Sequence, residues 1–253
     1  MSSKNIYSDG TYSRLNPNLH AEDSAYKMHY LGRLFETIDW EQTPIKILDI
    51  GGGAGELGKL VCEWFATRGH SVSASVLDVA EELINTQIKN NPYISNTYVG
   101  DLDQLGENRF DLALMIDVIE HIENHEQFAT KLNKYTTNIA YNIPTEINLF
   151  DLLRNFAMRK RYYPLQSESL GHVHFFSAIS AARFVARHHE MVVSIHPEYA
   201  LYVLTAPNKE YVNQPKRLHR KIELIISVAL QKLMPWVAPH IIQGSMFCLA
   251  KSK

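Results

Sequence analysis

Four glycines stand within five positions at the end of an apolar run, in the stretch KILDIGGGAGELGKL (residues 46–60). A glycine-rich turn between a strand and a helix allows a ligand to approach the backbone closely. Because such turns serve phosphates, dinucleotides and other cofactors, the neighbouring side chains must decide between these ligands.

Two phosphate-binding templates fit this turn poorly. The P-loop spacing GxxxxGK is present from Gly53, but Leu60 stands where a hydroxyl group would hold magnesium. The dinucleotide fingerprint requires a third glycine at the position of Glu56. A carboxylate in the first turn of a helix would repel a pyrophosphate at the same terminus. The residues therefore favour a ligand with a cationic amino group, and they disfavour an NAD-linked dehydrogenase.

Acidic residues also follow the next three predicted strands. Asp78 ends SVSASVLD, Asp101 follows NTYVG, and Asp117 ends FDLALMID, just ahead of Glu120 and His121. A carboxylate accepts hydrogen bonds from ribose hydroxyls or from an amino group. Capping of a helix by Asp78 and a simple turn at Asp101 are alternative roles.

In this order the motifs resemble those of the class I S-adenosylmethionine (SAM) dependent methyltransferases. The resemblance is specific over residues 45–145 and extends to GHVHFFS (171–177), which is similar to a segment of small-molecule and sugar methyltransferases. It implies SAM as cofactor, with Asp78 on the ribose, Asp101 near the adenine and the glycine turn around the methionine end. The cofactor-binding residues that it implies are Asp49, Gly51, Gly52, Gly53, Gly55, Asp78, Val79, Gly100, Asp101, Leu102, Asp117 and Val118.

The methyl acceptor needs a second set of residues. SAM carries an activated leaving group, so the protein must align the acceptor and, for a hydroxyl, remove its proton. Histidine suits this task because its ordinary pKa is about 6.5. His172 and His121 are the candidate bases, with structural roles as the alternative. Glu120 with His172 and His174 has the residue types of a metal site, but two histidines are a weak signal, and no metal is expected.

The acceptor itself is expected to be a small molecule, methylated at a hydroxyl of a sugar or of a polysaccharide or secondary-metabolite precursor. The N-terminal stretch YSDGTYSRLNPNLHAEDSAYK loosely resembles the leader of methyltransferases found with bacterial polysaccharide synthesis. A quinone-like or lipid-linked acceptor is the alternative within the same class. A non-catalytic SAM-binding partner subunit is the alternative of another class.

Two later segments could serve the acceptor or a partner. Residues 154–166, RNFAMRKRYYPLQ, are basic and aromatic, and in this family such a segment often caps the acceptor. A solvated helix face is the alternative. A helix predicted at 216–234 has a basic start and an apolar remainder. It suits peripheral contact with a membrane, cover for the sheet, or a homodimer contact.

These residues need an α/β scaffold. Short apolar runs alternate with helical segments, which predicts a parallel sheet with helices on both faces and ligands at the carboxyl ends of its strands. Strands are predicted at 45–50, 71–77, 96–100, 110–116, 137–143, 191–196 and 245–250. Helices are predicted at 21–38, 55–68, 80–90, 123–134, 178–189 and 216–234.

The resemblance sharpens this to one Rossmann-like domain with a seven-stranded, mostly parallel sheet and an antiparallel last strand. Within residues 1–253 it divides the chain into an N-terminal helical lid (1–40), a SAM-binding core (45–145), an acceptor cap inserted after the fifth strand (146–177), and C-terminal helices with closing strands (178–253).

Composition and charge narrow the expected partners and the expected compartment of the protein. The 253 residues carry a formal charge of -2, which gives no general attraction for nucleic acid. The two cysteines, Cys62 and Cys248, form no metal-ligand spacing and suit a reducing compartment. A secretory signal and an apolar run of membrane-spanning length are absent from the sequence, so a cytoplasmic location is expected.

Overall fold

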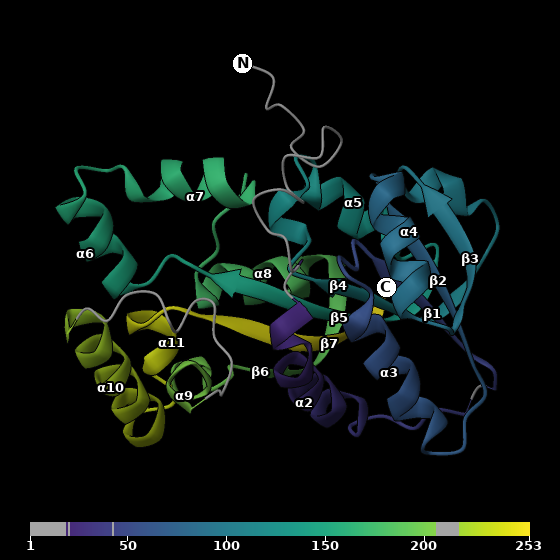
Figure 1. Ribbon diagram of the computed structural model, residues 1–253, viewed down its shortest axis with the longest axis horizontal. Helices are drawn as coiled ribbons and strands as arrows, with labels where there is room; N and C mark the ends of the chain where they lie inside the picture. Colours follow the sequence, from purple (N-terminus) through teal and green to yellow (C-terminus); the bar gives the residue numbers. More distant parts are fainter. Residues whose placement is uncertain (1–18, 20, 42, 206–217) are drawn as a thin grey trace.

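The computed structural model describes residues 19, 21–41, 43–205 and 218–253. Its centre is a seven-stranded sheet with the strand order β3-β2-β1-β4-β5-β7-β6 (Figure 1). The strands are β1 (Ile45–Ile50), β2 (Val72–Asp78), β3 (Ile94–Val99), β4 (Phe110–Ile116), β5 (Thr136–Thr145), β6 (His189–Ile195) and β7 (Gly244–Ser252).

The first five strands are parallel, whereas β7 runs antiparallel to both of its neighbours, β5 and β6. The expected seven-stranded, mostly parallel Rossmann-like sheet with an antiparallel last strand is confirmed. Because β1 to β5 are parallel, their carboxyl ends lie along one edge of the sheet, where ligands of such folds bind.

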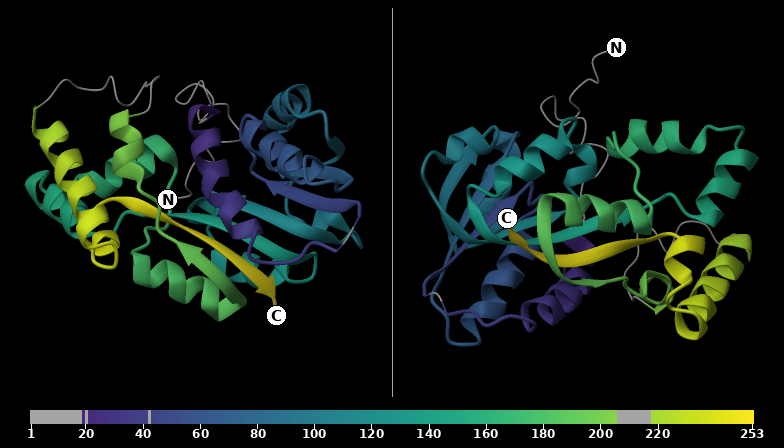
Figure 2. Two further views of the ribbon diagram at one scale, coloured as in Figure 1. Left: turned by 90° about the horizontal axis from the view of Figure 1, so that it is seen from below. Right: turned by 180° about the vertical axis from the view of Figure 1, so that it is seen from behind.

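Helices cover both faces of the sheet (Figures 1 and 2). One core lies under α2 (Ser24–Phe35) and α3 (Glu56–Ala66), and α4 (Glu81–Asn90) packs beside α3. The other lies under α5 (His125–Leu132) and α8 (Ala178–His188). Neighbouring residues of β1 alternate between the cores: Ile47 faces the first and Leu48 the second.

Short 3-10 turns follow the strands at the carboxyl edge. They are η2 (Leu102–Leu105) after β3 and η3 (Ile119–His121) after β4, while η1 (Ala21–Asp23) precedes α2. Backbone hydrogen bonds continue the sheet one residue beyond the strands: the N–H of Gly51 donates to the carbonyl oxygen of Leu77, that of Gly100 to Asp78 and that of Asp117 to Asn142. The loops that follow neighbouring strands are thereby held side by side.

A group of helices forms the other end of the molecule, at the left of Figure 1. They are α6 (Leu149–Ala157), α7 (Tyr162–Leu170), α9 (Tyr199–Thr205), α10 (Leu218–Leu233) and α11 (Ala238–Ile241). Of these only α10 was predicted, and the first two residues of that prediction, 216 and 217, lie outside the described residues. In the described part of the chain, no helix is both long and apolar enough to cross a membrane.

Several predicted boundaries were wrong by a few residues. The helix expected at 21–38 begins as η1 and ends at Phe35, and the helix expected at 123–134 ends at Leu132. The strand expected at 191–196 starts at His189, whose ring is buried against Tyr141 with a hydrogen bond of 2.8 Å. Tertiary contacts of this kind determine where helices and strands begin and end, which the periodicity of the sequence alone does not predict.

Candidate cofactor and acceptor site

The turn between β1 and α3 has a conformation that only glycine adopts easily. Gly51, Gly53 and Gly55 have φ angles of 62°, 55° and 81°, all in the left-handed region. A methyl group on Gly55 would also come within 2.8 Å of the Cα atom of Gln87 in α4. Backbone conformation and a close neighbour therefore both restrict this position to glycine.

Asp49, in β1, lies directly beneath this glycine turn. Its side chain is buried, and a methyl group on Gly52 or Gly58 would collide with its Oδ2 atom. Burial, and then the negative charge of Asp78, raise the pKa of Asp49 to about 7. Asp49 thus contacts the turn from the interior of the protein.

Asp78 ends β2 next to the turn. Its Oδ1 accepts a hydrogen bond from the N–H of Ala80 (3.0 Å), and its Oδ2 accepts one from Nε2 of Gln87 (3.3 Å). Burial raises the pKa of Asp78, although these hydrogen bonds act to lower it. Ala80, not Asp78, is the N-cap of α4. Each oxygen keeps a lone pair for a further donor, and the adjacent Val79 side chain is 51% exposed.

The loop after β3 is less tightly built. Gly100 has a φ of 123°, and Asp101 is an exposed residue that caps η2, its Oδ1 accepting from the N–H of Asp103 (2.9 Å). The turn role considered for Asp101 is therefore present. Leu102 is buried, and its side chain packs in the hydrophobic core.

Asp117 directly follows β4 and has a φ of 56°, which is uncommon outside glycine. Its carboxylate accepts from Nδ2 of Asn142 (2.6 Å) and pairs with Nζ of Lys27 (2.8 Å), which also pairs with Asp23 (2.9 Å). Burial acts to lower the pKa of Lys27, but the carboxylates, Asp117 first, raise it above its ordinary value. This buried ammonium ties α2 to the carboxyl end of β4.

Two further residues close in on the glycine turn. The side chain of Val118 lies against Gly51, where an added methyl group would meet it at 3.0 Å. The backbone oxygen of Leu19 lies 3.1 Å from where a methyl group on Gly53 would stand. Leu19 is therefore in contact with the turn and belongs to the segment 1–40 that was expected to form a lid; residues 1–18 and 20 of that segment lie outside the described residues.

Two carboxyl groups and two histidines gather farther along the edge, between η3 and the segment 171–177, called here the histidine segment. The rings of His121 and His172 lie 4.9 Å apart. Nδ1 of His172 is 2.8 Å from Oε2 of Glu146, and Nδ1 of His121 is 3.1 Å from the carbonyl oxygen of Gly171. Because an ionised carboxylate and a carbonyl only accept, we assign the proton to both Nδ1 atoms, which leaves an Nε2 lone pair on each ring.

Glu120 is the most enclosed member of this cluster. It is 1% exposed, and neither carboxyl oxygen has a hydrogen-bond partner among the described residues. Burial, and then the charge of Asp117, raise its pKa well above the ordinary value. Its backbone oxygen accepts from the N–H groups of Val173 and His174, at 3.0 Å each, which holds the histidine segment on η3.

One group in the described part of the chain has the make-up of a metal site. Ligand atoms of Glu120, His121 and His172 all lie within 4.8 Å of one another. His174, which the sequence grouped with Glu120 and His172, instead packs against His125 with ring centroids 3.8 Å apart and the ring planes tilted by 45°. The structure thus places His121 where His174 was expected.

The basic and aromatic segment after β5 divides into two parts. Arg154 is turned inward, pairing with Asp151 and, at 2.7 Å, with Glu223 of α10, and its guanidinium lies over the ring of the buried Tyr162. Residues 159–161 are exposed on the turn before α7. Arg154 and Tyr162 are therefore occupied within the protein.

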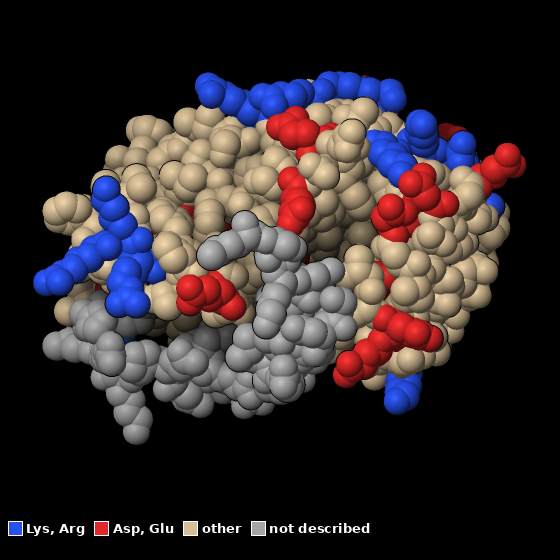
Figure 3. Space-filling view, turned by 90° about the horizontal axis from the view of Figure 1, so that it is seen from above, with Lys and Arg blue, Asp and Glu red and all other residues tan. Residues whose placement is uncertain are grey.

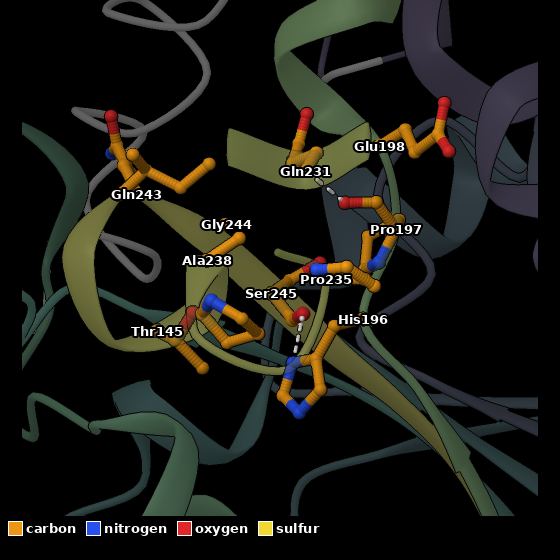
Figure 4. A pocket seen from close by; sticks show the side chains of 12 residues that line it. Thr145, His196, Pro197, Glu198, Gln231, Pro235, Ala238, Gln243, Gly244 and Ser245 are labelled. Carbon is orange, nitrogen blue, oxygen red and sulfur yellow. Dashed lines mark hydrogen bonds between the residues drawn. The ribbon is translucent and has the colours of Figure 1, made fainter. Parts of the chain in front are cut away.

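Seen from above, the molecule is hollowed near its middle, and acidic side chains lie beside the hollow (Figure 3). A separate cavity of about 90 Å³ lies beyond the end of β5, between the start of β7 and α10–α11 (Figure 4). Thr145, at the end of β5, lines this cavity, and Nδ1 of His196 faces the carbonyl oxygen of Ser245 at 3.2 Å. Glu146, the next residue along the chain, holds His172.

Three residues of this edge were missed at the level of sequence. Glu146 follows the fifth strand directly, just as Asp78 ends the second, so its position was a usable signal. Lys27 is a charged residue on a helix face that otherwise carries apolar residues, which was a second signal. Gln87 has no comparable signal in the sequence.

Comparison with known proteins agrees with this geometry. The family model described as a methyltransferase domain matches residues 20–188, well over half of the chain. The ubiquinone biosynthesis O-methyltransferase of Rickettsia conorii (strain ATCC VR-613 / Malish 7) is 29% identical over 118 residues, which are 45% of this chain and 39% of that protein. The match thus spans less than half of the relative's length.

Three solved structures share the fold at low sequence identity. The N-methyltransferase NodS from Bradyrhizobium japonicum WM9, in complex with S-adenosyl-L-homocysteine (SAH), has a TM-score of 0.54 and 13% identity, with 96% of this chain and 99% of that one covered. The cyclopropane synthase MmaA2 from Mycobacterium tuberculosis has a TM-score of 0.57 and 13% identity, with coverage of 88% and 84%. The geranyl diphosphate C-methyltransferase from Streptomyces coelicolor A3(2) has a TM-score of 0.58 and 8% identity, with coverage of 96% and 84%.

At these identities the solved structures show a shared fold, whereas the family model identifies the group. The seven-stranded, mostly parallel sheet of this chain agrees with that fold. The chain therefore belongs to the methyltransferase domain family, and it has the fold of the class I SAM-dependent methyltransferases.

Proposed function

We propose that this protein transfers the methyl group of SAM to a hydroxyl group of a small acceptor. The observation that carries the proposal is the buried pair of Glu146 and His172 at the carboxyl edge, next to His121. A hydroxyl needs a base within reach, and a histidine whose Nδ1 proton is held by a carboxylate presents Nε2 for that role.

The cofactor lies, in this proposal, across the ends of β1 to β4. Asp78 accepts from the ribose hydroxyls, since each of its oxygens retains a lone pair. Val79 and Asp101 stand at the adenine, and Gly51 to Gly55 surround the methionine end. Asp117 and Val118 lie where the cofactor passes toward the histidine cluster.

The chemical step is an in-line displacement. The acceptor oxygen forms a bond to the methyl carbon as the carbon–sulfur bond breaks, and the sulfonium becomes the neutral thioether of SAH. The hydroxyl proton moves to Nε2 of His172, and the resulting imidazolium is stabilised by Glu146. His121 is the weaker candidate base because its Nδ1 is held by the carbonyl oxygen of Gly171 and not by a carboxylate.

Two acceptor classes follow. A sugar, or a sugar nucleotide or other polysaccharide precursor, is the first, as the resemblance of GHVHFFS to sugar methyltransferases indicates. The second is a hydroxyl of a quinone-like acceptor, favoured by the similarity to a ubiquinone biosynthesis O-methyltransferase.

The test is release of SAH from SAM in the presence of hydroxylated sugar nucleotides and, in parallel, of catechol and hydroxybenzoate acceptors. Turnover with one class, lost in His172→Asn, supports the proposal and selects the acceptor. SAM binding without turnover on any hydroxyl acceptor would instead indicate a non-catalytic SAM-binding partner subunit. A product methylated on nitrogen or carbon would contradict the proposal.

A further inference from the structure

Helix α6 carries its apolar side chains on the outside of the protein. Leu149, Leu152, Leu153 and Phe156 are 47%, 49%, 57% and 80% exposed. Their spacing of three, one and three residues puts them on one face of the helix. A helix of a water-soluble domain normally turns such a stripe toward the core, so α6 has the opposite orientation.

The polar face of α6 is held inside by specific contacts. Asp151 is fully buried, and it accepts from Nδ2 of Asn148 (2.6 Å) and pairs with Arg154. Arg154 in turn pairs with Glu223 of α10 at 2.7 Å. Asn155 accepts from the backbone N–H of Tyr162 at 3.2 Å. These contacts fix the rotation of the helix, so the exposed stripe is built into the fold.

Helix α10 lies at the same end of the molecule as α6 (Figures 1 and 2), and it exposes a second set of apolar side chains. Ile222, Ile225 and Ile226 are 48%, 60% and 44% exposed, and Trp236, just after the helix, is 74% exposed. The Arg154–Glu223 ion pair joins α10 to α6. Exposed apolar side chains that gather on two linked helices mark a surface that something covers.

The basic residues beside this apolar surface indicate what kind of partner covers it. Arg159, Lys160 and Arg161 are all exposed on the turn that follows α6, and the first two have φ angles of 51° and 63°. Figure 3 shows basic side chains gathered at this left-hand end of the molecule. Three cations beside an apolar stripe complement the anionic headgroups and acyl chains of a bilayer surface. A two-fold contact between two copies of this face would bring like charges together.

We propose that α6, the basic turn 159–161 and the exposed stripe of α10 form a docking face for an anionic lipid bilayer. The apolar stripe of α6 enters the headgroup region, the three cations pair with anionic lipids, and Trp236 lies at the boundary, where its amphipathic ring is favoured. The contact is peripheral. It does not depend on the acceptor proposed above.

Flotation of the full-length protein with two kinds of vesicle tests this face. Vesicles contain phosphatidylcholine alone or phosphatidylcholine with phosphatidylglycerol. We expect binding to the anionic vesicles that weakens as salt rises, since exposed charges are screened. Phe156→Ser should reduce the bound fraction at least tenfold, and the triple variant Arg159→Gln, Lys160→Gln, Arg161→Gln should remove the preference for anionic vesicles.

Ile179→Ser is the matched control, because Ile179 is 50% exposed on α8, away from this face. It should bind as the wild type does. SAH affinity, measured by calorimetry, should be the same in all variants and shows that each is folded. Failure of the wild type to bind anionic vesicles would overturn the proposal, as would unchanged binding by Phe156→Ser. Dimerisation seen by light scattering and lost in Phe156→Ser, without vesicle binding, would assign the face to a second copy.

Discussion

The two halves of the carboxyl edge are built in different ways. The glycine-loop half comprises the carboxyl ends of β1 to β4 and the loops that directly follow them. The histidine half brings together η3, the residue after β5 and the histidine segment, with Glu146 and His172 separated by 26 positions in the sequence. The first half is fixed by parallel strands, and the second by side-chain contacts between distant segments.

We expect this difference to separate residues that set the affinity for the cofactor from residues that set the rate of methyl transfer. A cofactor shared by a whole family is held by strand ends that the fold itself aligns. The acceptor is met by segments that insertions reshape without disturbing the sheet, which is where families change their substrates. Substitutions in the glycine-loop half should therefore change cofactor affinity, and those in the histidine half should change turnover.

The largest effect is expected in the histidine half. His172→Asn removes the proposed base, and Glu146→Gln places an amide donor where Nδ1 now donates, which favours the wrong tautomer. Turnover should fall by about 10²–10⁴-fold in each variant, with SAH affinity unchanged. A steady-state SAH-release assay with the acceptor found by the screen measures this. Full activity in His172→Asn would transfer the role to His121.

The next effect concerns the glycine turn. Gly55→Ala combines a left-handed φ of 81° with a contact of 2.8 Å to the backbone of Gln87. Gly69→Ala has a similar φ of 89° but meets nothing within 4 Å, so it should cost only the conformational strain, about 1–2 kcal/mol. Thermal unfolding and SAH calorimetry should show the larger loss of stability, and loss of binding, in Gly55→Ala alone. Equal behaviour of the two variants would remove the packing argument.

A third effect is a pH dependence in the glycine-loop half. Asp49 has a folded-state pKa raised to about 7, against about 3.9 in an unfolded chain. Between these values the folded protein binds more protons, so stability from Asp49 is complete below about pH 4 and is lost as the pH rises to 7. When the pH is raised from 5 to 8, the unfolding free energy of the wild type should therefore fall by on the order of 2 kcal/mol more than that of Asp49→Asn.

Urea unfolding at the two pH values measures this difference in ligand-free protein. Asp39→Asn is the control, because Asp39 is exposed and should follow the wild type. Parallel loss of stability in Asp49→Asn and wild type would show that Asp49 is solvated in solution and does not lie buried beneath the turn.

The smallest effect is expected at Asp101. Its Oδ1 is already engaged by the N–H of Asp103, and the residue is exposed. A single exposed hydrogen bond to the adenine contributes about 0.5–1.5 kcal/mol, so Asp101→Ala should weaken SAH binding by about tenfold at most. A loss of a hundredfold or more in calorimetry would make this loop a principal part of the site.

The same contrast explains what the sequence could predict. Strands β1 and β4 were predicted at their observed bounds, because buried parallel strands appear as continuous apolar runs between clear turn signals. The glycine turn and the aspartates after it are also local features. Glu146 and Lys27 stand out in the sequence by their positions, but their roles could not be assigned because their partners, His172 and Asp117, are brought near only by the fold.

The exposed apolar side chains of α6 are a second feature that the sequence alone could not predict. Its periodicity indicates an amphipathic helix, but a pattern of apolar residues says nothing about whether the stripe faces the core or the solvent. The buried contacts of Asp151 and Arg154 settle the orientation, and these depend on Glu223 in a helix far along the chain.

The most direct test of the division between the two halves is calorimetric titration with SAH of the wild type, Asp78→Ala and His172→Asn, with NAD as the comparison ligand. The wild type should bind one equivalent of SAH and no NAD. Asp78→Ala should lose about 1.5–3 kcal/mol of binding free energy, as expected for hydrogen bonds to a charged group, while His172→Asn keeps the wild-type affinity. Unchanged affinity in Asp78→Ala, or a comparable loss in His172→Asn, would contradict the account.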